Sequence, residues 1–346
     1  MRGFSFNRLS RTCTALLLAA LTGTAMGAIT TGSAPAASGP MPEGITSRIA
    51  DESADALWYG DFDRLEKIYN SVRQSSEFVD GGATRLQWFR VGLARVYEED
   101  DATDPYFAQL EAMTHAWAVE RPNSPLAQLL YARALYARAR SFRGGDYASR
   151  VLPPAWQEFK KYIALEKVQL ERNADMLKNE STADIYLMMV IRNDDGSFET
   201  LRALALDALA RNSVDDGGFV ELATASLPKW GGNATRFDTV AREAARRARP
   251  ASGMAMYSYI YDQATDDFEG EMFEVSEVDW PTMRQGFRDW MARWPNLYML
   301  NRFARDACHA QDKPTTREVL DLIGNRPLAR AWDNQFESCR RWALEP

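Results

Sequence analysis

The chain has 346 residues and 46% of them are hydrophobic, so it can fill one large core or two modest ones and is not intrinsically disordered. Its formal net charge of −7 argues against nucleic acid and anionic lipid surfaces as partners, because both attract basic proteins. With two histidines and three cysteines, it lacks the clustered ligands typical of zinc sites.

The first predicted element is a secretory signal peptide over residues 1–27. Arg2, Arg8 and Arg11 precede an apolar run, and small residues follow at 25–27. This order of basic, apolar and small residues is typical of a segment that is cleaved during export. Cleavage takes the formal net charge from −7 to −10, because the segment holds those three arginines and no acidic residue. We therefore expect an exported protein of the periplasm or extracellular space, without a membrane span after cleavage.

A spacer is expected next, over residues 28–50, because residues 28–44 are dominated by Ala, Gly, Ser, Thr and Pro. Helical periodicity starts near Ile45. We place the folded domain at 51–346, with a possible subdivision near 213–218. Clean alternation of β-branched residues is missing from the sequence, so strands are not expected.

Within the domain, apolar residues recur every three or four positions, which is the spacing of an amphipathic helix. One stripe runs from Ala54 to Tyr69 and a second covers 85–97, whereas 126–142 is dense in Ala, Leu and Tyr, as expected for a helix packed on both sides. Glycine and proline clusters separate these segments, so the sequence predicts an all-α fold. The predicted breaks lie at 81–82, 121–123, 144–145, 151–154, 194–196, 216–218, 230–232, 250 and 295.

Several helix–turn–helix units look related, which favours an α-solenoid of degenerate, tetratricopeptide-like repeats. The clearest unit runs from Asn301 through Asp312 to Gly324 and predicts a helix, a short turn and a second helix. Such units cannot bury their apolar faces alone, and therefore they stack.

Two segments resemble a bacterial domain-of-unknown-function family with tetratricopeptide-like helical repeats. The first is LPKWGG at 227–232, followed by a helix over 237–247, and the second is NRFARDAC at 301–308. The resemblance covers most of residues 51–342. It implies a helical-repeat fold and protein–protein contact, and it brings no catalytic residue to this chain.

The Trp-Gly-Gly sequence has a physical interpretation of its own. Trp230 has a large ring to bury and one N–H to satisfy, while Gly231 and Gly232 permit a positive φ or the close approach of the next helix. Asn233 or Thr235 can cap the helix that begins near Phe237. We predict a structural corner fixed by Trp230. The alternative is a ligand groove around the ring.

A second aromatic group lies near the C-terminus. Phe287, Trp290 and Trp294 are spaced by three and four residues and therefore share one face of a helix. We predict a packed interface between helices. The alternative is an aromatic groove that binds a peptide or a sugar, since aromatic side chains anchor interfaces.

Cys308 and Cys339 flank a predicted helix–turn–helix, and in an oxidising compartment they are expected to form a disulfide. The alternative is a pair of buried free thiols. Cys308 and His309 are not expected to form a nucleophilic dyad, because adjacent helical residues point about 100° apart. The acidic run at 266–279 matches no calcium loop, and neither a metal site nor a cofactor is implied.

The sequence favours a non-enzymatic repeat protein that binds an unidentified protein or a cell-envelope component. It contains no phosphate-binding loop, nucleophile elbow or metalloprotease helix. The alternatives are a structural domain of an envelope assembly and a hydrolase of cell-wall or glycan material that uses a Glu or Asp as its acid. A binder predicts a broad groove without an isolated buried carboxylate. A hydrolase predicts a deep pocket with two carboxyls about 5–10 Å apart.

Overall fold

The computed structural model describes residues 45–98, 104–144, 151–194, 196–268 and 270–345. Over these ranges the regular structure consists of α-helices and short 3-10 helices, so the predicted all-α fold is confirmed. Phe78 and Thr84 form an isolated β-bridge. The predicted signal peptide at 1–27 and most of the predicted spacer lie outside the described residues.

The first helices form a compact group at the N-terminal end of the described chain. They are α1 (Ile45–Trp58), α2 (Phe62–Val72), the 3-10 helix Asp80–Gly82 and α3 (Arg85–Tyr97). Helix α1 begins at Ile45, where helical periodicity was predicted to start, and therefore overlaps the end of the predicted spacer 28–50. The stripe from Ala54 to Tyr69 is divided between α1 and α2, because Gly60 takes a φ of 68° and Asp61 caps α2.

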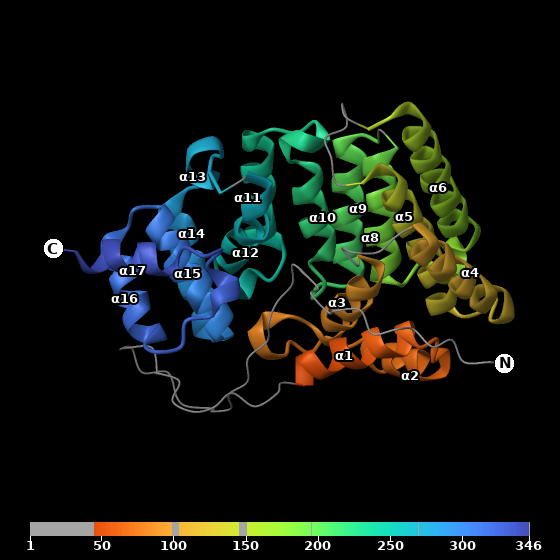
Figure 1. The fold of residues 1–346 in the computed structure, drawn as a ribbon, viewed down its shortest axis with the longest axis horizontal. Coiled ribbons are helices and arrows are strands. Elements are labelled where there is room, and N and C mark those ends of the chain that lie inside the picture. Colours follow the sequence, from red (N-terminus) through yellow and green to blue (C-terminus); the bar gives the residue numbers. More distant parts are fainter. Residues whose placement is uncertain (1–44, 99–103, 145–150, 195, 269, 346) are drawn as a thin grey trace.

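The middle helices pack mainly against their neighbours in sequence. They are α4 (Asp104–Glu120), α5 (Pro125–Arg143), α6 (Pro153–Arg172), α7 (Ala174–Leu177), α8 (Ser181–Asn193), α9 (Phe198–Arg211), α10 (Gly217–Ala225), α11 (Ala234–Arg247) and α12 (Ala255–Gln263). Helix α5 lies between α4 and α6 and is buried along most of its length, as predicted. In Figure 1, α8, α9, α10 and α11 stand side by side. Across residues 213–218, where a subdivision was predicted, α10 packs on both α8 and α9.

The last helices continue this neighbour-to-neighbour packing to the C-terminus. They are α13 (Met272–Val275), α14 (Trp280–Arg293), α15 (Leu297–His309), α16 (Lys313–Ile323) and α17 (Phe336–Leu344). The predicted unit from Asn301 to Gly324 is confirmed as α15, a short turn and α16. Asp312 caps α16 by accepting from the backbone N–H of Thr315, and Gly324 follows the helix with a φ of 60°.

A buried ion pair ties the N-terminal helices to the middle of the chain, and a second ion pair lies beside it. The guanidinium of Arg90 on α3 contacts both carboxylate oxygens of Asp215, at 3.0 and 2.5 Å, and Arg249 contacts Asp216 at 2.5 Å. Burial by itself would raise the pKa of Asp215. The charge and hydrogen bonds of Arg90 have the larger effect and lower this pKa to about 2. Helix α3 therefore lies across the N-terminal ends of α8 and α10 (Figure 1).

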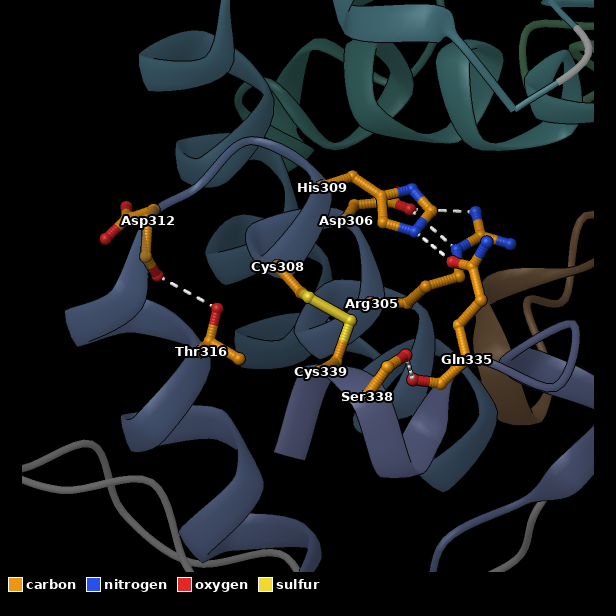
Figure 2. Close-up of a disulfide and its surroundings, with 9 residues drawn as sticks. All are labelled: Arg305, Asp306, Cys308, His309, Asp312, Thr316, Gln335, Ser338 and Cys339. Atoms are coloured by element: carbon orange, nitrogen blue, oxygen red, sulfur yellow. Dashed lines mark hydrogen bonds and ion pairs between the residues drawn. A yellow bond between two sulfur atoms is a disulfide. The ribbon is translucent and has the colours of Figure 1, made fainter. Parts of the chain in front are cut away.

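A disulfide connects α15 to α17. The Sγ atoms of Cys308 and Cys339 are 2.00 Å apart, and the Cα atoms are 5.8 Å apart (Figure 2). The two cysteines therefore lie at disulfide distance, as predicted from the sequence. Because Cys308 is bonded to Cys339, it offers no thiolate that could act with His309. His309 instead lies against the side-chain oxygen of Gln335.

We predict that replacing both cysteines by serine lowers the free energy of unfolding by about 3–4 kcal/mol, because a bond across 31 residues restricts the unfolded chain. Urea unfolding of the wild type and of the double variant, with and without a reductant, measures the difference. The reductant should lower the unfolding midpoint of the wild type and leave that of the variant unchanged. Coincident curves without reductant would contradict the prediction.

A network of buried charges lies beside the disulfide. The side chain of Arg305 is fully buried, and its guanidinium donates to Asp306 at 2.8 and 2.9 Å and to Asp333 at 2.9 Å (Figure 2 shows Arg305 and Asp306). On the preceding turn of α15, Arg302 donates to Asp262 of α12 at 2.5 Å. The network therefore joins α12, α15 and the segment that precedes α17.

Candidate functional site

The structural corner predicted at Trp230 is present between α10 and α11. Pro228–Trp230 forms a 3-10 helix, and Gly231 follows with a φ of 80°. Gly232 has a different role, since a Cβ there would collide with the carbonyl oxygen of Ser226. Asn233 caps α11 by accepting from the backbone N–H of Arg236 at 2.8 Å, and the helix begins at Ala234 instead of near Phe237.

The corner places Trp230 among side chains from three other helices. The guanidinium carbons of Arg192 and Arg143 lie 4.1 and 5.8 Å from the centre of the Trp230 ring. Arg143 also lies 5.7 Å from the ring centre of Trp156. Arg143, Trp156 and Trp230 are partly exposed residues, whereas the side chain of Arg192 is only 7% exposed. We name these four residues the Arg–Trp cluster. Cation–π contacts of this kind are favourable, and they hold the planar groups in a fixed arrangement.

The two arginines of the cluster differ in their partners. Arg192 donates through Nε to Glu221 on α10 at 2.5 Å, whereas Arg143 meets no carboxylate among the described residues and donates to the backbone oxygen of Gly144 at 3.2 Å. Burial, and then the positive charge of Arg140, lowers the pKa of Arg143. A guanidinium keeps its proton at neutral pH, so Arg143 brings to the cluster a positive charge that no described carboxylate compensates.

Two N–H groups in this cluster have no acceptor within the described part of the chain. They are Nε of Arg143 and Nε1 of Trp230, and both atoms are buried. A buried donor without an acceptor costs about 1–3 kcal/mol. The two unpaired donors of the cluster can therefore be satisfied by an acceptor from outside the chain.

A buried carboxyl lies close to the cluster. Glu166 on α6 is fully buried, and neither of its oxygens accepts a hydrogen bond from a described residue. Burial raises the pKa of Glu166 well above its usual value, although the charges of Arg133 and Arg192 oppose this shift. Glu166 is therefore protonated over a wider pH range than an exposed glutamate.

We predict that Glu166→Met raises the free energy of unfolding at neutral pH by about 1–3 kcal/mol, because it removes a buried group without partners. The native state keeps the Glu166 proton that the unfolded chain releases, so stability associated with Glu166 is present below pH 4.5 and is lost as pH rises through its folded pKa. The gain from methionine should therefore be larger at pH 8 than at pH 5 in urea unfolding.

Glu171→Met, on the exposed surface of the same helix, serves as the matched control for that prediction. It makes the same chemical change without removing a buried carboxyl, and it should alter stability by no more than about 0.5 kcal/mol at either pH. Destabilisation by Glu166→Met at both pH values would contradict the assignment of Glu166 as a strained buried acid.

The second predicted aromatic group forms a packed interface. Phe287 and Trp290 are buried, and Trp290 stacks on Tyr259 of α12 with 5.2 Å between ring centres. Trp294 contacts Phe78, in the segment before α3, at 5.4 Å between ring centres. These side chains therefore join α14 to α12 and to the N-terminal helices. The structure supports the interface interpretation of this group over the groove.

Comparison of the chain with protein-family models, curated proteins and solved structures finds no match. The resemblance of residues 227–232 and 301–308 to a tetratricopeptide-like family therefore stays a prediction. Within the described ranges, no group of three His, Cys, Asp or Glu side chains could hold a metal ion. None of the helices described combines the length and apolar character needed to cross a bilayer.

The two best-formed pockets of the described structure are small. One, between α10, α11 and α12, has a volume of about 30 Å³, and the other, between α1, α3 and α4, has about 40 Å³. Each has room for about one water molecule. The Arg–Trp cluster is consequently the strongest candidate site. Sequence reasoning identified Trp230 but missed Arg143 and Arg192, whose one local signal is their position in the last turn of a helix.

Proposed function

We propose that this protein is an exported, non-enzymatic α-helical repeat protein that binds a protein segment through the Arg–Trp cluster. The observation that carries the proposal is the meeting of four side chains from four separate elements. Trp156, Arg143 and Trp230 are partly exposed, and the side chain of Arg192 is the buried member of the cluster. Tryptophan and arginine are the residue types most enriched among those that dominate binding energy at protein interfaces. Tryptophans dispersed singly over the surface, without arginines beside them, would not support this proposal.

The packing order of the helices supports a degenerate, tetratricopeptide-like solenoid as the scaffold. From α4 to α12, most helices contact the helix before and the helix after them in the chain. Contact between successive units is the defining property of repeat proteins, which present extended surfaces to their partners. The disulfide between Cys308 and Cys339 supports export, because disulfides persist in oxidising compartments.

Glu166 is the observation that favours the alternative of a glycan hydrolase. An isolated buried carboxyl with a raised pKa is a property of general acids, and Glu221 lies within electrostatic range of it. A general acid must reach the atom that it protonates, however, and Glu166 is fully enclosed by the protein. We therefore favour binding over hydrolysis.

Affinity capture from the envelope extract of the source cells, with the purified chain as bait, tests the proposed function. We expect a specific protein that rebinds the chain after separate purification, in a one-to-one ratio measured by analytical ultracentrifugation. A variant with both Arg143→Gln and Trp230→Phe should retain less of that protein. Failure to recover any specific protein, together with turnover of a glycan by the purified chain, would overturn the proposal in favour of the hydrolase.

A further inference from the structure

The two unpaired donors in the Arg–Trp cluster belong to neighbouring side chains. The guanidinium carbon of Arg143 lies 5.8 Å from the centre of the Trp230 ring, and Nε of Arg143 and Nε1 of Trp230 are both buried without an acceptor in the described structure. Both groups can donate and neither can accept. A ligand that satisfies them must therefore bring acceptor atoms, and it must approach through the partly exposed faces of Arg143 and Trp230, because the donor atoms themselves are enclosed.

The charge around these donors is positive, although the chain as a whole carries a formal charge of −7. Arg140, Arg143 and Arg192 are close enough for their charges to interact. Among the described residues, Arg192 is the member of this trio with a carboxylate partner, Glu221. Among the described residues, the local surplus is therefore two positive charges, which favours an anionic ligand over a neutral one.

We propose that the Arg–Trp cluster recognises a side-chain carboxylate of an acidic peptide segment. This inference rests on the proposed binding function and assigns the chemistry of its partner. A carboxylate presents two acceptor oxygens in one plane, matching one guanidinium N–H and one indole N–H, and such charge-assisted bonds are among the stronger ones in proteins. The rings of Trp156 and Trp230 provide apolar surface for the methylene groups of a glutamate.

Isothermal titration calorimetry of the full chain with capped hexaglutamate at low salt tests this inference. We expect binding that weakens as salt is added and that is absent with capped hexalysine. Arg143→Gln should weaken hexaglutamate binding about tenfold or more, because it removes a charged donor. Trp230→Phe should weaken it severalfold without changing the net charge, since it removes the indole N–H and keeps an aromatic ring.

The matched control is Arg48→Gln on α1, which removes one positive charge from a side chain that is 70% exposed and distant in sequence from the cluster. It should leave the affinity unchanged, and circular dichroism should show that all variants are folded. Equal weakening by Arg48→Gln, or unchanged binding in both cluster variants, would overturn the inference. Inorganic phosphate that binds as tightly as hexaglutamate would show a simple anion site and would also overturn it.

The outcome also separates this inference from the function on which it rests. If the chain captures and rebinds a specific protein but does not bind hexaglutamate, the carboxylate assignment fails and the binding function stands. If the chain captures no specific protein and turns over a glycan, the binding function itself fails.

Discussion

Replacing Arg305 by methionine is expected to lower the free energy of unfolding by about 3–5 kcal/mol. The side chains of Arg305 and Asp306 are fully buried, and that of Asp262 is 1% exposed. Removing the guanidinium would leave the Asp306 carboxylate in the core without its cation. An uncompensated buried charge is far more costly than a missing surface interaction, so the loss should be visible in urea unfolding at neutral pH.

The control for this substitution is Arg288→Met, which breaks an exposed ion pair. The side chains of Arg288 and Glu318 are 45% and 54% exposed and are 3.0 Å apart, so the loss should be no more than about 1 kcal/mol. A double variant, Arg305→Met with Asp306→Leu, should recover part of the stability, because it removes both buried charges. If Arg305→Met and Arg288→Met lowered the free energy of unfolding equally, the prediction that the buried network stabilises the fold more than an exposed ion pair would be wrong.

Replacing Trp290 by alanine is expected to cost about 3–5 kcal/mol, because it opens a large cavity between α12, α14 and the segment before α3. Trp290 is 1% exposed and lies between Tyr259 and Trp294. Gly82 lies against Trp290 and Trp294, because a Cβ at that position would lie 3.0 Å from Trp290 and 2.8 Å from Trp294. The loss of stability should lower the unfolding midpoint in both thermal and urea unfolding.

This substitution also separates the two interpretations of the C-terminal aromatic group. Trp290→Phe, which keeps an aromatic ring and most of the volume, should cost clearly less than Trp290→Ala. If Trp290→Ala left stability unchanged and instead abolished capture of the partner protein, the aromatic group would be a binding groove and the packed interface would be the wrong description.

Local features of this fold were predictable from the sequence because neighbouring residues determine them. Asp61, Asn233 and Asp312 each precede a helix and cap it, since a short side chain needs to reach a backbone N–H only three residues away. Gly231 adopts a positive φ in the turn for which the sequence indicated it. The approximate limits of α5, α15 and α16 follow from the same kind of signal.

The candidate site was only partly predictable, because its residues come from separate helices. Nothing in the segments around Arg143 and Arg192 shows that both guanidinium groups lie against Trp230. Glu166 has the sequence context of an ordinary surface glutamate, yet it is fully buried. The positions of these side chains depend on how α5, α6, α8 and α10 pack, and periodicity within one helix carries no information about that packing.

The pairing of Arg90 with Asp215 has a consequence for the time at which folding can be completed. The two residues are separated by 125 positions, so α3 emerges during synthesis long before its carboxylate partner exists. Helices α1 to α3 can form early, but the charge of Arg90 remains uncompensated until the start of α10 has been made. Although most of its helices pack on their neighbours in sequence, this protein reaches its final state only after its N-terminal helices and its middle have come together.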